Sequence, residues 1–116
     1  MVRVSGRYFE MNLTDEYVLP RLEVEFKKGL PHRSGIYFIL LNECYGNIHN
    51  IGYIGEAKDI KIRFHNHHIL REYPGEVHSI AWLILPESDS LERRALEKLY
   101  IMAYKPPYNK EVDRNE

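Results

Sequence analysis

Two short apolar segments that contain glycine constrain the fold of this chain more than any other feature. Residues 34–41 are apolar on both faces of a possible strand and are rich in β-branched and aromatic side chains. Residues 51–55 are shorter and carry two glycines, which favours a close backbone approach or a turn into the next element. The residues between them, 42–47, have turn composition. The pattern predicts a β-hairpin that sets Tyr37 near Tyr53.

The periodicity farther along predicts two helices and a third strand. We expect one helix from Lys58 to about Leu70 and a buried strand over residues 77–85. A capping box of Asp89 and Glu92 opens the second helix. The expected core stripe of that helix is Leu91, Ala95, Leu99, Met102 and Ala103. This order predicts an α+β domain, with a small three-stranded antiparallel sheet flanked by helices and an N-terminal extension.

Residues 1–33 form this extension and are the hardest part to interpret. Residues 7–13 alternate as a strand would, and residues 14–16 look like a helix start. Residues 22–26 fit either a strand or a helix, and both stay open. The extension could serve as a lid, a dimer contact or an added edge strand. The polar residues 110–116 form a tail.

The composition is that of an ordinary single domain. The chain has 116 residues, of which 44% are hydrophobic and 28% charged. No apolar run approaches the roughly 20 residues that span a bilayer, and the first residues lack the apolar stretch of a signal peptide. Cys44 has no second cysteine with which to form a disulfide. We therefore expect a cytoplasmic protein that does not bind membranes.

The charge is nearly balanced, at a formal net charge of -1, which counts against nucleic-acid binding as a whole-chain property. Its distribution is uneven, because residues 58–71 contain Asp59 as their one acidic residue before Glu72. The basic residues in this segment are Lys58, Lys61, Arg63 and Arg71. We expect them to form a local DNA-binding stripe, although such a run could also be an ordinary solvated helix face.

The order of these motifs resembles that of the GIY-YIG nuclease family. The resemblance covers residues 34–109: two tripeptides, Gly35-Ile36-Tyr37 and Tyr53-Ile54-Gly55, a helix with an arginine, a helix with a glutamate, and a Pro-Tyr-Asn ending at Asn109. It implies a metal-dependent endonuclease that hydrolyses DNA phosphodiester bonds with Mg²⁺ or Mn²⁺. The catalytic residues that it implies are Tyr37, Tyr53, Arg63, His67 and Glu97. Gly35, Gly55 and Asn109 would support the site.

Glu97 and Arg63 would deal with the phosphate. A carboxylate oxygen suits a hard cation, and a guanidinium fork fits phosphate oxygens. The structural alternatives are a surface pair of Glu97 with Arg93 or Arg94, and a pair of Arg63 with Asp59 four residues earlier.

The remaining groups would move or hold protons. We expect Tyr37 to be the general base and Tyr53 to help position the attacking water, whereas either could instead be a packed strand aromatic. His67 could be a general acid or base, a hydrogen-bond donor, or merely a surface histidine. One departure from the family is Glu56, because some members have a lysine directly after the second tripeptide.

Two other classes of function compete with the nuclease. One is a non-catalytic nucleic-acid-binding module with the same fold, and the other is a structural or partner-binding protein. A zinc site built on His65, His67 and His68 is rejected, since no cysteine pair completes it and two of the rings would diverge on one helix. Specificity would have to come from the loops, from residues 1–33, from a homodimer or from a separate protein.

Overall fold

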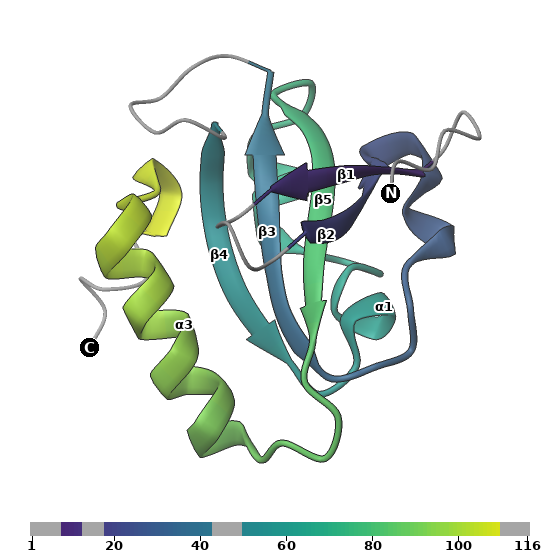
Figure 1. The fold of residues 1–116 in the computed structure, drawn as a ribbon. Coiled ribbons are helices and arrows are strands. Elements are labelled where there is room, and N and C mark those ends of the chain that lie inside the picture. The colour runs from purple at the N-terminus through teal and green to yellow at the C-terminus, as the bar shows by residue number, and fades with distance from the viewer. Residues whose placement is uncertain (1–7, 13–17, 43–49, 110–116) are drawn as a thin grey trace.

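A five-stranded antiparallel sheet organises the molecule (Figure 1), which we describe from a computed structural model for residues 8–12, 18–42 and 50–109. The strand order across the sheet is β1-β2-β5-β3-β4. The strands are β1 (Tyr8–Asn12), β2 (Val18–Glu23), β3 (Gly35–Leu41), β4 (Ile51–Ala57) and β5 (Val77–Ile84). The predicted α+β class is confirmed, and the three expected strands are β3, β4 and β5.

The N-terminal extension accounts for the two strands beyond the predicted three. β1 and β2 form a hairpin, and β2 adds to β5 with Leu22 opposite Ile80. Pro20 lies just outside the residues of β2 that pair with β5, where β2 has a neighbour on one side only. Of the alternatives left open for this segment, an addition to the sheet is the one observed. The helix start expected at residues 14–16 lies outside the described residues.

Among the residues that the structure describes, five short or medium helices connect and cover the strands. They are η1 (Val24–Gly29), α1 (Ile60–Arg63), α2 (His68–Glu72), α3 (Ser90–Tyr104) and η2 (Pro107–Asn109), of which η1 and η2 are 3₁₀ helices. The stretch 22–26 that suited either a strand or a helix is divided, since β2 ends at Glu23 and η1 follows. Within the part of the chain that is described, no helix has both the length and the apolar character needed to cross a membrane.

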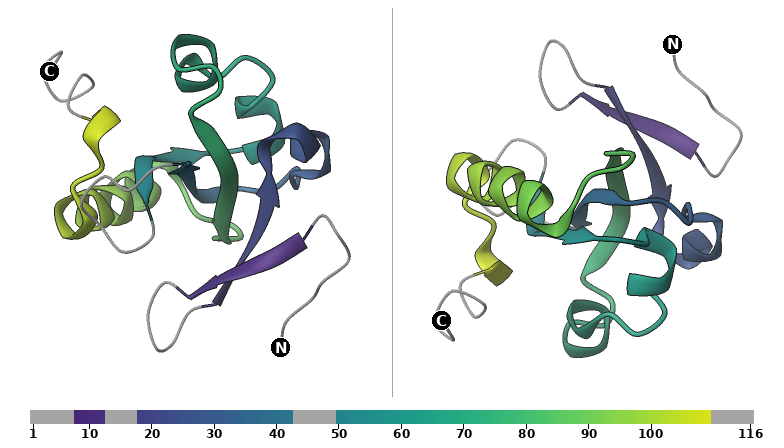
Figure 2. Two further views of the ribbon diagram at one scale, coloured as in Figure 1. Left: turned by 90° about the horizontal axis from the view of Figure 1, so that it is seen from above. Right: turned by 90° about the horizontal axis from the view of Figure 1, so that it is seen from below.

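β3 lies at the centre of the site-bearing part of the sheet and is buried on both faces. Its odd-numbered side chains, such as Tyr37 and Ile39, join a core with Phe64 of the α1 end and Ile69 of α2. We call this side of the sheet the tyrosine face. The even-numbered side chains of β3 point into a second core under α3, which we call the α3 face. Its members from the strands include Ile36, Phe38, Leu40 and Ile54. Figure 2 shows α3 on one side of the sheet and α1, α2 and η1 on the other.

The predicted core stripe of α3 is wrong. Leu91, Leu99 and Met102 are 75%, 62% and 66% exposed. The apolar residues that pack against the sheet are instead Leu96, Tyr100, Ile101 and Tyr104. Both faces of this helix carry apolar side chains, so periodicity alone could not choose between them, and the face with the two tyrosines covers the strands. The capping box of Asp89 and Glu92 is present as predicted.

The single helix predicted from Lys58 to Leu70 is also wrong, because the chain breaks it into α1 and α2. α1 ends at Arg63, and His67 adopts an extended conformation as the N-cap of α2. The imidazole of His67 accepts a hydrogen bond from the backbone N–H of Ile69 at 3.1 Å. A side chain that bonds its own backbone in this way competes with a continuing helix. Arg63 and His67 therefore do not lie one turn apart on a single helix, as a continuous helix from Lys58 to Leu70 would have placed them.

Candidate active site

The two motif tyrosines lie on the tyrosine face of neighbouring strands. In the antiparallel pairing of β3 with β4, Tyr37 stands opposite Gly55 and Ile39 opposite Tyr53. The rings of Tyr37 and Tyr53 are stacked, with centroids 6.3 Å apart and 26° between their planes. A Cβ atom on Gly55 would come within 2.3 Å of the Tyr37 hydroxyl oxygen. Glycine at this position is therefore what allows the Tyr37 ring to cross over the second tripeptide.

His67 completes a buried polar contact with Tyr37. Its side chain is almost fully buried, and its Nε2 atom lies 2.8 Å from the hydroxyl oxygen of Tyr37. Phe64 and His68 both stack on the imidazole, at centroid distances of 4.8 and 4.9 Å. His67 is thus not a surface histidine, which was one of the alternatives that the sequence left open.

The protonation state of His67 follows from its partners. Burial, together with the positive charge of Arg63, lowers the pKa of His67 to about 3, so the ring is neutral near pH 7. Its Nδ1 accepts the Ile69 backbone N–H, so the one ring proton of the neutral form must sit on Nε2. His67 therefore donates its Nε2–H to the hydroxyl oxygen of Tyr37. Of the three roles expected for His67, this geometry favours that of a hydrogen-bond donor.

Arg63 and Glu97 act on the tyrosine pair from two different helices. Burial is the main cause of the raised pKa of both Tyr37 and Tyr53; the positive charge of Arg63 opposes that rise, and the negative charge of Glu97 adds to it. Arg63 also helps to keep His67 neutral. The structure thus brings the five residues of the predicted catalytic set into one electrostatic neighbourhood, although they come from β3, β4, α1, the α2 N-cap and α3.

Both tyrosines rest in their neutral form. Burial raises the pKa of Tyr37 well above its usual value near 10, and the neighbouring Tyr53 adds to that shift. Burial likewise raises the pKa of Tyr53. A phenol in this environment loses its proton only when further positive charge arrives beside it.

Glu56, the departure from the family pattern, lies on the other face of the sheet. It pairs with Ile36 across the β3–β4 ladder, and its carboxylate accepts a hydrogen bond from Arg93 at 2.8 Å. Arg93 is a buried residue of α3 and also donates to the backbone oxygen of Ser88 at 2.6 Å. Arg94 is more distant from Glu56, at 3.9 Å. A lysine at position 56 would therefore lie next to Arg93 and not next to Tyr53. Arg63 is the cation whose charge acts on the pKa of both tyrosines.

Asn109 fixes the end of the predicted module to the second tripeptide. Its side-chain oxygen accepts the backbone N–H of Ile54 at 2.8 Å, and its amide donates to the backbone oxygen of Ile54 at 2.9 Å. These two bonds satisfy the open edge of β4 beside Tyr53. A side chain at position 35 is excluded for a steric reason, since a Cβ there would come within 2.0 Å of the Leu83 carbonyl oxygen of β5.

The expected DNA-binding residues do not share one helix. Lys58 is exposed ahead of α1, Lys61 is half-buried on α1, and Arg71 is exposed in the last turn of α2. Asp59 caps α1 by accepting the Ile62 backbone N–H at 2.9 Å and contacts His32 at 2.9 Å. It is therefore engaged by the helix start and by the extension, and the expected Asp59–Arg63 pair is not among the ion pairs of the described residues.

The donor set at the site fits a hard cation with a single protein ligand. Over residues 8–12, 18–42 and 50–109, no group of three or more His, Cys, Asp or Glu side chains could hold a metal ion together. Mg²⁺ commonly keeps several waters and takes one or two carboxylates plus phosphate oxygens from the substrate. Glu97, whose charge acts on both tyrosines, is the carboxylate that could hold such an ion.

Two contributors to this region escaped the sequence analysis. Phe64 packs edge-on against Tyr37 with centroids 4.8 Å apart. Lys27 of η1 donates to the backbone oxygen of Phe64 at 3.0 Å, across 37 positions of sequence. No local pattern connects the extension to α1, so nothing in the sequence could have shown this contact.

Comparison of the chain with protein-family models, with curated proteins and with solved structures finds no match. Function must therefore be inferred from the residues and their arrangement.

Proposed function

We propose that this protein is a metal-dependent endonuclease of the GIY-YIG type that hydrolyses DNA phosphodiester bonds. The observation that carries the proposal is the contact of Tyr37 with His67, in a site where Tyr53, Arg63 and Glu97 also act on the same hydroxyl. Packing alone does not explain a buried Tyr–His pair flanked by both a cation and a carboxylate. Hydrolysis of a phosphodiester does, because it needs a proton acceptor, a phosphate-binding cation and a means of stabilising the leaving oxygen.

In this mechanism the Tyr37 hydroxyl first loses its proton to solvent as positive charge arrives beside it, and the resulting phenolate takes the proton of the attacking water. Its oxygen already accepts the Nε2–H of His67, and that bond would stabilise the phenolate as it forms. Arg63 would bind phosphate oxygens and at the same time bring positive charge toward both tyrosines. Tyr53, stacked on Tyr37, would orient the water. Glu97 would hold the Mg²⁺ or Mn²⁺ ion, whose chemistry would be charge stabilisation at the phosphate and at the leaving oxygen.

A second candidate is a nucleic-acid-binding module of the same fold without catalysis. The raised pKa of both tyrosines favours it, because a binding module needs no tyrosine that ionises. The two candidates differ in what they require of Glu97, since a carboxylate beside a bound phosphate hinders binding unless a cation lies between them.

The test is cleavage of plasmid, hairpin and branched DNA, with and without Mg²⁺ or Mn²⁺, by the unaltered protein and by Glu97→Ala. We expect metal-dependent cleavage that Glu97→Ala abolishes while DNA binding persists. Binding without cleavage of any of the three DNAs would support the non-catalytic module. Near-normal cleavage by Glu97→Ala in Mg²⁺ would falsify the metal assignment.

A further inference from the structure

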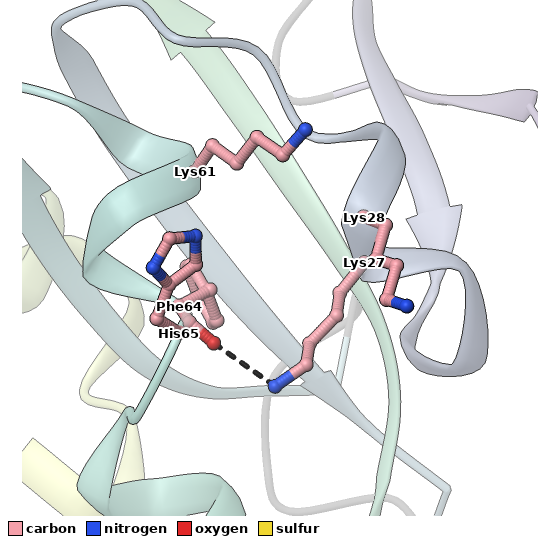
Figure 3. Close-up of a pocket in the computed structure, with 5 residues that line it drawn as sticks. All are labelled: Lys27, Lys28, Lys61, Phe64 and His65. Atoms are coloured by element: carbon pink, nitrogen blue, oxygen red, sulfur yellow. Dashed lines mark hydrogen bonds between the residues drawn. The ribbon is translucent and has the colours of Figure 1, made fainter.

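A cavity lined by three lysines lies between the N-terminal extension and α1. Its volume is about 370 Å³, and we call it the lysine pocket. The lining residues are Lys27, Lys28, Lys61, Phe64 and His65. Figure 3 shows the Lys61 side chain reaching from α1 toward η1, and the Lys27 side chain reaching from η1 to the carbonyl oxygen of Phe64. The two segments therefore build the pocket jointly.

The residues that line the lysine pocket include three lysines and no acidic side chain. Within the described part of the chain, none of its three lysines forms an ion pair with a carboxylate. Glu25, the one acidic residue of η1, does not line it. Like charges brought together from distant parts of a sequence repel one another, and a bound anion would relieve that repulsion. The pocket is thus suited to an anionic ligand.

The division of work among the lysines follows from their contacts. Lys27 donates one of its three N–H groups to the Phe64 carbonyl oxygen, and this hydrogen bond connects η1 to the end of α1. Lys28 is exposed and Lys61 half-buried, and neither is held by a partner among the described residues. Lys27 therefore positions the pocket, while Lys28 and Lys61 are the groups that can turn their ammonium ions toward a ligand.

The lysine pocket is close to the candidate active site. Lys61 and Arg63 belong to the same four-residue helix, α1. Phe64 lines the pocket, and its ring packs edge-on against that of Tyr37 with centroids 4.8 Å apart, so the pocket and the candidate site share this side chain. The charge of Lys27 also contributes to the lowered pKa of His67.

We propose that the lysine pocket binds a backbone phosphate of the nucleic-acid strand beside the phosphate at Arg63. This inference rests on the proposed function, because the strand is the one whose scissile phosphate would lie at Tyr37 and Arg63. A volume of about 370 Å³ exceeds what a bare phosphate needs and has room for its sugar, while the lysine stems and Phe64 give the walls apolar surface. The N-terminal extension thereby becomes part of the substrate-binding surface.

The experiment measures binding separately from cleavage. In full-length Glu97→Ala protein, the affinity for a DNA oligonucleotide duplex is measured at several salt concentrations, with and without the further change Lys28→Ala/Lys61→Ala. Each lost phosphate contact should reduce the slope of log affinity against log salt by about 0.9. Because the pocket is proposed to hold one phosphate, we expect the slope to fall by about that amount and the affinity at low salt to fall by about tenfold. The matched control is Lys98→Ala/Lys105→Ala, which removes two exposed positive charges from the α3 side.

Four results would overturn the proposal. The first three are an unchanged slope in the Lys28/Lys61 variant, an equal fall of the slope in the Lys98/Lys105 control, and no DNA binding at all. The fourth is release of the duplex by inorganic phosphate at a concentration equal to that of the DNA phosphates, which would indicate a site for free anions. Cleavage by the otherwise unaltered protein is assayed in parallel. Cleavage with an unchanged slope would refute the pocket and leave the nuclease standing. A lowered slope without cleavage would support the pocket and refute the nuclease.

Discussion

The two faces of the sheet are built from alternate residues of the same strands, yet they are suited to different tasks. On the α3 face, Phe38 packs edge-on against Tyr100 with centroids 5.3 Å apart, within an apolar core. On the tyrosine face, Tyr37 packs against Phe64 but also holds a hydrogen bond to a buried, neutral His67. The face that stabilises the fold carries a long amphipathic helix, and the other is covered by short helices that end or begin at polar site residues.

This difference teaches that burial alone does not separate structural from functional side chains. Tyr37 and Phe38 are both almost fully buried, and they are neighbours in sequence. They differ in their contacts, because the Phe38 ring packs within an apolar core. The Tyr37 hydroxyl instead accepts a hydrogen bond from His67, and the charges of Arg63 and Glu97 act on its pKa. Substitutions on the two faces should therefore affect different quantities.

The largest expected effect is on the tyrosine face. Tyr37→Phe removes only the hydroxyl group, and we expect the single-turnover cleavage rate to fall by about a thousandfold or more. Tyr53→Phe should lower the rate less, because Tyr53 lacks the His67 hydrogen bond that Tyr37 has. Single-turnover cleavage at saturating DNA measures both. If Tyr53→Phe is the more damaging change, Tyr53 is the general base.

The neighbouring position on the α3 face should affect stability instead. Phe38→Ala leaves a cavity under Tyr100, and we expect the free energy of unfolding to fall by about 3–5 kcal/mol. The cleavage rate per folded molecule should stay close to normal. Urea denaturation followed by a rate measurement under conditions where the variant is folded gives both quantities. A large rate loss in the folded variant would mean that the two faces are not functionally separate.

The buried His67 predicts a pH dependence of stability. Its folded pKa of about 3 lies below the unfolded value near 6.5, so the unfolded chain binds a proton in this interval and the folded chain does not. Stability is therefore fully present above about pH 6.5 and falls as the pH drops, by about 1.4 kcal/mol per pH unit until the folded pKa is reached.

The pH dependence of stability that His67 contributes should vanish in His67→Gln. His65→Gln, at an exposed position, should leave it unchanged. Denaturation at several pH values between 4.5 and 7 compares the three proteins, and the difference between slopes isolates His67 from other titrating groups. Equal slopes for the unaltered protein and His67→Gln would show that His67 is not held neutral.

Gly55→Ala tests how tightly the tyrosine face is packed. The added Cβ would enter the space of the Tyr37 hydroxyl, which is held between the strands and His67. We expect a loss of about 1–3 kcal/mol in stability and a slower cleavage rate, since Tyr37 must shift away from its partner. Thermal denaturation and the single-turnover rate check the two effects. A normal rate would indicate that the position of Tyr37 relative to His67 does not matter for chemistry.

The smallest expected effect is on the outer side of α3. Leu99→Gln alters a side chain that the sequence placed in the core but that is 62% exposed, so we expect a change within about 0.5 kcal/mol. Tyr100→Ala, one position along, should cost about 3 kcal/mol or more because it removes a ring from the α3 face. Chemical denaturation of both variants gives the comparison. A loss for Leu99→Gln as large as that for Tyr100→Ala would mean that this stripe is covered.

The sequence by itself determined the elements whose signals are local. The runs of β-branched and aromatic residues in β3, β4 and β5 predicted those strands, and the hairpin pattern predicted that Tyr37 and Tyr53 would be neighbours. The Asp89–Glu92 capping box likewise fixed the start of α3. In each case the residues that decide the structure lie within a few positions of one another.

Only the tertiary structure decided which surface each element buries and which distant groups meet. The face of α3 that packs, the break between α1 and α2, and the attachment of the extension all depend on contacts across many residues: Tyr100 with Phe38, His67 with Tyr37, and Lys27 with Phe64. The choice between two apolar faces, or between a continuous helix and a buried histidine cap, depends on free energies that arise only when the partners are in place. The neutral state of His67 and the direction of its hydrogen bond to Tyr37 follow from the same long-range packing.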